Sequence, residues 1–146
     1  MWVFAIRDRG VSENQTGSSA ASGWFNTTCG YKIVGTDDWE DYFSAESGST
    51  SFTLNKSGLY RCVFRIHGSL STAARMGAGW FNGSTELAGD WVWCGSTAGH
   101  TAEAELVIDV NAPTTITPKI WVSGQTFTKS VGGHLTNFTI EYLGTL

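Results

Sequence analysis

Proline, charge and long apolar runs are all scarce in this chain. Two of its 146 residues are proline and 15% are charged, with nine Lys and Arg against thirteen Asp and Glu. The basic residues are scattered and form no stripe, which argues against nucleic acid as a partner. No apolar stretch is long enough to cross a membrane, so no membrane partner is expected.

The first residues lack the features of a secretory leader. Two arginines and one aspartate interrupt residues 1–9 before an apolar run can develop, whereas a signal peptide has such a run after a basic start. We therefore expect the chain to be complete from Met1 and to be made in the cytoplasm of the cell that produces it. A protein made in this way can still leave that cell on a released particle.

Cysteine occurs at three widely spaced positions, Cys29, Cys62 and Cys94. A disulfide-stapled secreted module generally has an even number in a denser pattern. A structural zinc site needs a Cys/His cluster, and the sequence has none. The spacing instead indicates buried free thiols that behave as small apolar residues.

The residues that are abundant predict a globular all-β domain. The chain is 41% hydrophobic and 13% aromatic and contains eighteen glycines, a composition that excludes disorder. No stretch has a helical stripe, while roughly eight to ten short alternating segments recur at spacings of about 8–12 residues. We expect a sandwich or barrel formed by a single domain, residues 1–146. Residues 1–23 are expected to supply the first strand and a flexible arm.

The clearest strand runs through residues 59–67. Alternation places one set of side chains toward the core: Tyr60, Cys62, Phe64 and Ile66. The other set mixes charged and apolar residues: Leu59, Arg61, Val63, Arg65 and His67. We interpret that second face as partly solvated or as lying against another chain. In the last strand, Phe138, Ile140 and Tyr142 are expected to point inward. Pro118 suits an edge strand, a bulge or a strand start.

Several of these segments resemble the C1q/TNF-like jelly-roll family. The matching residues are Tyr42-Phe43, Phe52-Thr53-Leu54, Gly58 to Phe64, Trp80-Phe81-Asn82-Gly83, Glu105 to Val110 with Thr115 to Val122, and Phe138 to Leu143. The likeness covers roughly residues 40–146. The sequence departs from the family at Asn111-Ala112-Pro113, where the family usually has Gly-Asp, so no family calcium or ligand residue is carried over.

The resemblance implies a jelly-roll β-sandwich that forms a homotrimer and that binds or scaffolds instead of catalysing. Similar folds occur in bacteriophage tail-fibre tips and capsid decoration proteins. The leading hypothesis is a capsid decoration (cement) protein that resides in the virion, contacts the major capsid protein, and needs no cofactor. Residues 10–23 are the expected arm. The alternatives are a tail-fibre tip that binds a host glycan or protein, and a secreted C1q-like binding module.

Catalytic and metal-binding chemistry has weak support. Ser, His and acidic residues are present, but His67, His100 and His134 lie in unrelated contexts and no nucleophile elbow occurs, so we predict that the protein is not an enzyme. A small hydrolase is the alternative from that class. The acidic run could offer oxygen ligands to calcium, although a solvated turn is the commoner outcome. Its members are Asp37, Asp38, Glu40 and Asp41.

Tryptophan is the residue type that most favours a binding surface. There are seven, and the candidates for exposed, sugar-stacking rings are Trp24, Trp80, Trp91 and Trp93. The competing interpretation places such rings in the core or at a subunit interface. Five glycosylation sequons also occur, and we interpret them as turn residues. They start at Asn14, Asn26, Asn55, Asn82 and Asn137.

Overall fold

The computed structural model describes residues 2–8, 22–26, 31–34, 39–44, 51–95, 99–123, 127–129 and 137–146. Apart from one short 3-10 turn, η1 (Trp39–Asp41), the elements are strands. They are β1 (Trp2–Asp8), β2 (Ser22–Asn26), β3 (Tyr31–Val34), β4 (Phe43–Ser44), β5 (Phe52–Leu54), β6 (Gly58–Leu70), β7 (Ala74–Asn82), β8 (Thr85–Cys94), β9 (His100–Val110), β10 (Thr114–Ser123), β11 (Phe127–Lys129) and β12 (Asn137–Gly144).

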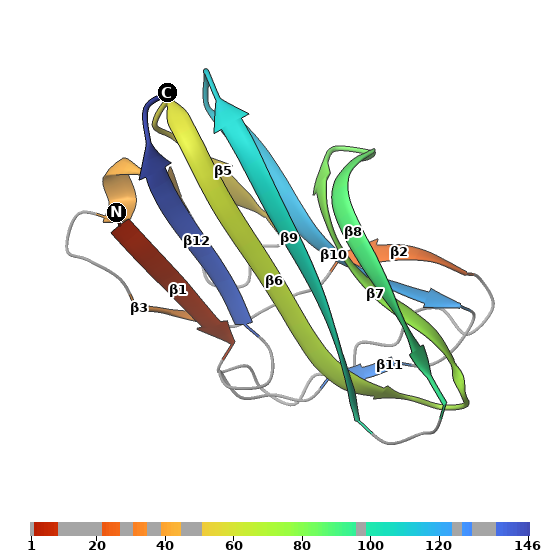
Figure 1. Ribbon diagram of the computed structural model, residues 1–146. Coiled ribbons are helices and arrows are strands. Elements are labelled where there is room, and N and C mark those ends of the chain that lie inside the picture. Colours follow the sequence, from red (N-terminus) through yellow and green to blue (C-terminus); the bar gives the residue numbers. More distant parts are fainter. Residues whose placement is uncertain are drawn as a thin grey trace.

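The strands form two six-stranded antiparallel sheets that pack face to face as a jelly roll (Figure 1). In the first sheet the order is β9-β6-β12-β1-β3, with β11 beside the far end of β6. In the second sheet the order is β8-β7-β10, and β5 and β2 share the other side of β10, with β4 outside β5. The all-β, two-sheet prediction is confirmed.

Alternation along β6 builds the core as the sequence predicts. Every second residue of this strand is buried, including Tyr60, Cys62, Phe64 and Ile66. Phe138 of β12 stacks on Phe64 with ring centroids 4.9 Å apart. Large apolar rings that meet between the sheets supply most of the burial that holds the two layers together.

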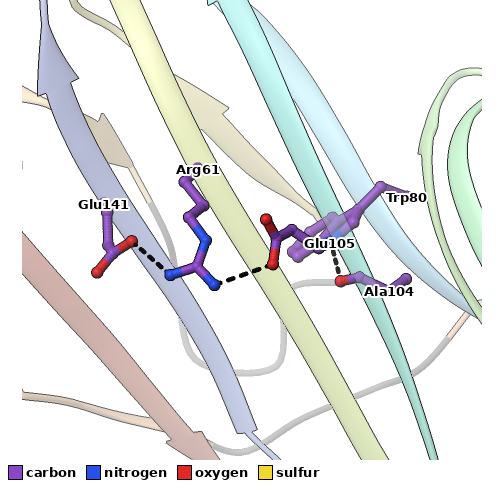
Figure 2. A network of polar contacts seen from close by, with 5 residues as sticks. All are labelled: Arg61, Trp80, Ala104, Glu105 and Glu141. Carbon is purple, nitrogen blue, oxygen red and sulfur yellow. Dashed lines mark hydrogen bonds and ion pairs between the residues drawn. The ribbon is translucent and has the colours of Figure 1, made fainter.

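Trp80 of β7 ties the two sheets together at the centre. Its side chain is fully buried, and its indole Nε1 donates a hydrogen bond of 3.1 Å to the carbonyl of Ala104 on β9 (Figure 2). The ring also makes edge contacts with Phe52, Phe64 and Phe138. The indole therefore satisfies its polar atom across the sandwich while its surface stays in the apolar core.

Pro118 lies inside β10 and inside the second sheet, with no register shift against β7, so the suggestion of an edge strand, a bulge or a strand start is wrong. β10 pairs with β7 along residues 117–122. On its other side, β10 pairs with β5 through residues 114–116 and with β2 through residues 119–123. Pro118 falls in the gap between those two partners. A residue without an N–H group is tolerated there, because the ladder changes partner at that point.

Several boundaries differ from the sequence prediction. β6 runs from Gly58 to Leu70, beyond the predicted residues 59–67, and the short β11 was not predicted. β1 pairs with both β12 and β3, so it is an integral sheet strand. β2 already includes Ser22 and Gly23; the rest of the expected arm, residues 10–21, lies outside the described residues. In the part of the chain that the structure covers, no helix has the length and apolarity needed to span a membrane.

Candidate functional site

The outward surface of β9, β6 and β12 carries charges that are matched within the chain. Arg61 of β6 lies between Glu105 of β9 and Glu141 of β12, at 2.9 and 3.1 Å (Figure 2). The exposed Val107 lies opposite Arg61, and Val63 lies opposite Glu105. We call these five residues the paired-charge face. They include two outward residues, Arg61 and Val63, that the alternation of β6 predicted.

These ion pairs shift the pKa values of Arg61 and Glu105. The hydrogen bonds and charges of Glu105 and Glu141 raise the pKa of the Arg61 guanidinium further above its ordinary value. The hydrogen bond from Arg61 holds the pKa of the Glu105 carboxyl below its usual range. Each ionised group thus stabilises the charged form of its partner. Because the network is open to water in the single chain, it adds little to the stability of the monomer.

Two histidines meet at the far end of β6 and β9, although the sequence showed them in unrelated contexts. His67 pairs in register with Thr101, and His100 pairs with the neighbouring Gly68. The Nδ1 atom of His67 lies 2.7 Å from the hydroxyl of Thr101. Burial, Arg65 and His100 together lower the pKa of His67. The lowered pKa favours the neutral form of His67. The two histidines do not by themselves form a catalytic triad, which needs a nucleophile and an acid in line.

An aromatic cluster covers the outward side of the second sheet. The ring of Trp91 on β8 lies 4.5 Å from that of Trp121 on β10 and 5.1 Å from that of Trp24 on β2, both edge to face. Trp24 in turn contacts Phe81 at 5.0 Å. Trp93 follows on the same side of β8 and is 65% exposed. We call Trp24, Trp91, Trp93 and Trp121 the tryptophan surface.

Glycines on β7 make room for these rings. A side chain on Gly79 would come within 2.9 Å of the Trp24 ring, and one on Gly77 within 3.3 Å of the Trp91 ring. The rings therefore lie directly over the backbone of β7. This arrangement explains why β7 is buried on both sides over most of its length, with no alternation of burial.

A pocket of about 270 Å3 opens where the end of β8 approaches the start of β9. It is lined by Asp90, Trp91, Val92, Thr101, Ala102 and Glu103. Asp90 and Glu103 are exposed carboxylates, and Trp91 belongs both to this pocket and to the tryptophan surface. The lining thus combines an aromatic residue, two acceptors and a hydroxyl beside one another.

The structure separates the four predicted tryptophans. Trp24 and Trp91 contact each other and Trp93 lies beside them, while Trp80 is buried in the core and presents no surface to a partner. Trp121 was not among the tryptophans predicted as site residues. Trp121 pairs with Trp24, which is far from it in the sequence. A local sequence pattern cannot predict such a long-range pairing.

The acidic run shows no metal site in the described residues. Glu40 and Asp41 are exposed on η1, and Asp37 and Asp38 lie outside the described residues. Within the described part of the chain, no three potential ligands gather closely enough to hold a metal ion.

The predicted free thiols are confirmed for two positions. Cys62 and Cys94 are buried and unpaired, and burial raises the pKa of both thiols. Cys29 lies outside the described residues. Two sequon asparagines make hydrogen bonds to residues distant in the sequence and not within their own turns: Asn55 donates to the hydroxyl of Ser44, and Asn82 donates to the carbonyl of Thr115.

Comparison with solved structures gives the fold. The crystal structure of murine APRIL at pH 5.0 superposes with a TM-score of 0.67 at 14% identity, and the match covers 97% of this chain and 98% of that one. The structure of Eiger TNF from S. frugiperda gives a TM-score of 0.62 at 7% identity, with 99% and 94% coverage. No family model and no curated protein matches the sequence. The fold is therefore a TNF-like jelly roll.

Proposed function

We propose that the protein is a non-enzymatic homotrimer that decorates a bacteriophage capsid by contacting its major capsid protein. The TNF-like jelly roll, over nearly the whole chain, supports a binding or scaffolding role. Self-association has support from the paired-charge face, which is the observation that carries the proposal. The virion setting rests on the resemblance of the sequence to the C1q/TNF-like jelly rolls that occur in bacteriophage particles.

The composition of the paired-charge face suits burial against a second copy. Burying an unpaired charge is costly, whereas a charge that already has its hydrogen-bonding partners loses less on leaving water. Arg61 brings two such partners with it. The exposed Val107 and the partly exposed Val63 add apolar area between the charges. A neighbour's sheet edge can pack on this surface without leaving an unmatched cation.

Decoration would work by mass action. A trimer that binds the assembled shell and not its separated subunits stabilises the shell in proportion to its bound contacts. Three equivalent copies give three attachment points, so modest single contacts become strong together. The Gly- and Ser-rich residues 10–21 are the segment that we expect to reach the shell.

The self-association part is tested by native mass spectrometry of the purified protein. Arg61→Ala should shift the trimer toward monomer because it leaves two carboxylates in the interface without their cation. Val107→Lys should do the same because it places a charged side chain where the interface would bury an apolar one. Arg75→Ala is the matched control, since Arg75 is an exposed arginine on the opposite sheet. A wild-type monomer at every concentration, or trimers unaffected by both substitutions, would overturn this assignment.

The virion part is tested on particles purified by density gradient from the natural source. The chain should be present at a fixed ratio to the major shell protein, and deletion of residues 10–21 should lower its occupancy. Fractionation with tail fibres would favour the receptor-binding alternative. Glycan mass on the sequon asparagines would instead favour a secreted C1q-like module.

A further inference from the structure

The tryptophan surface is not used by the proposed self-association, which lies on the other sheet. It spans β2, β10 and β8 in a band, with the ring centroids of Trp91 and its neighbours 4.5 to 5.1 Å apart. Trp91 is 42% exposed and Trp93 is 65% exposed. Edge-to-face packing against Trp24 and Trp121 fixes Trp91 in orientation, so a ligand would meet a preformed platform at little entropic cost.

The polar groups of the pocket beside Trp91 are mainly hydrogen-bond acceptors. Asp90 and Glu103 are carboxylates that accept hydrogen bonds, and Thr101 adds a hydroxyl. Asp90 already accepts a 2.8 Å hydrogen bond from the backbone N–H of Trp91, which fixes that carboxylate against the backbone of β8. A volume of about 270 Å3 is just below the range of roughly 300–1,000 Å3 for drug-sized ligands. The pocket therefore fits a group the size of one sugar unit.

We propose that this junction of β8 and β9 binds a neutral hexopyranose unit of a glycan. The apolar face of the sugar ring stacks on Trp91 or Trp93, and its hydroxyls donate to Asp90 and Glu103. This binding site is additional to the proposed trimer and capsid roles and does not depend on them. Along β9 the pocket residue Glu103 and the interface residue Glu105 are two positions apart, about 7 Å, so the two surfaces adjoin along this strand.

The charge and polarity of the pocket lining favour a neutral sugar over acidic sugars and apolar ligands. Sialylated or sulfated sugars would meet two carboxylates at close range and be repelled. A purely apolar ligand would strip water from Asp90 and Glu103 without replacing their hydrogen bonds, which costs free energy. A polyol with one apolar face satisfies the ring and the acceptors at once. Its lack of charge also makes binding insensitive to salt.

The test is a titration of the wild-type protein with neutral oligosaccharides, acidic oligosaccharides and a lysine-rich peptide, followed by calorimetry and tryptophan fluorescence. A neutral probe should bind with the same affinity at low and high salt. Trp93→Ala should weaken it by about three- to tenfold, the value of one aromatic contact, and Trp93→Tyr should restore most of the loss. Trp93 is the best site to vary, because its exposure makes misfolding a small risk.

A second pair of variants tests the pocket itself. Glu103→Gln should weaken neutral-sugar binding, while Glu86→Gln, another exposed glutamate outside the pocket lining, should leave it unchanged. Native mass spectrometry of each variant separates loss of sugar binding from loss of the trimer. The proposal is overturned if no neutral probe binds the folded protein, if acidic probes bind better, if the peptide binds in a salt-sensitive manner at the same residues, or if both glutamine variants behave alike.

Discussion

A single indole links the two sheets, and its burial makes it the most sensitive position in the core. Trp80 combines full burial, contacts with three aromatic rings and a hydrogen bond to the opposite sheet. Trp24, Trp91, Trp93 and Trp121 contribute to a surface instead. Tryptophan therefore has one role in the core and another on the outward side of the second sheet. Only the packing distinguishes the two roles.

Substitution of Trp80 should separate these contributions. Trp80→Ala should lower the free energy of unfolding by about 3–5 kcal/mol, because a large cavity remains. Trp80→Phe should cost about 1–3 kcal/mol, because it keeps an aromatic ring but removes the donor to Ala104. Chemical denaturation of both variants measures this, with Trp93→Ala as a control that should change stability by no more than about 0.5 kcal/mol. Equal losses at the two tryptophans would contradict the placement.

His67 should make stability fall on mild acidification. Its pKa is lowered by burial, by Arg65 and by His100, whereas in the unfolded chain it has the ordinary value of about 6.5. The unfolded state therefore binds more protons below about pH 6.5, and the free energy of unfolding decreases as the pH falls through that value. Above it, the contribution is fully present.

Thermal unfolding at about pH 7.5 and about pH 5.5 checks this expectation on either side of the ordinary histidine pKa. His67→Gln should show a smaller drop in melting temperature between the two conditions than the wild type. An unchanged drop in His67→Gln would show that other groups cause the acid sensitivity.

At the scale of elements, β7 is the strand on which the outer aromatic cluster depends. Gly79 leaves space that the Trp24 ring fills. Gly79→Ala should displace that ring, lower stability by about 1–3 kcal/mol and shift the tryptophan emission. Gly95→Ala is the matched control, because the nearest atom to an added Cβ there is 3.7 Å away. Identical spectra for the two variants would contradict the packing over Gly79.

Local patterns predicted the elements better than their partners. The alternation in β6 and β12 identified the inward residues Tyr60, Phe64 and Phe138 because each strand has one apolar face. β7 has no alternation of burial, because tryptophans from other strands bury its outward side. Pro118 was misplaced because its tolerance depends on where two neighbouring strands end. Trp121 was missed as a site residue for the same reason: strand pairing over a long sequence separation leaves no local trace.

For the whole molecule, trimer formation would couple folding to concentration. If the folded chain associates and the unfolded chain does not, the melting temperature rises with protein concentration. Scanning calorimetry over a wide concentration range should show this rise for the wild type and for Arg75→Ala. Val107→Lys should unfold at a temperature that no longer depends on concentration. A wild-type melting temperature independent of concentration would count against a trimer that is linked to folding.

The pairing of the first and last strands has a mechanical consequence. Trp2 lies opposite Tyr142, so the two ends of the described chain emerge at the same end of the sandwich (Figure 1). A force applied between those ends would open the β1–β12 ladder one hydrogen bond at a time, like a zipper. A force applied across the sheet faces would instead load the side-chain packing between the two sheets over its whole area at once. The molecule should resist tension far better when it is held by its surfaces than when it is held by its ends.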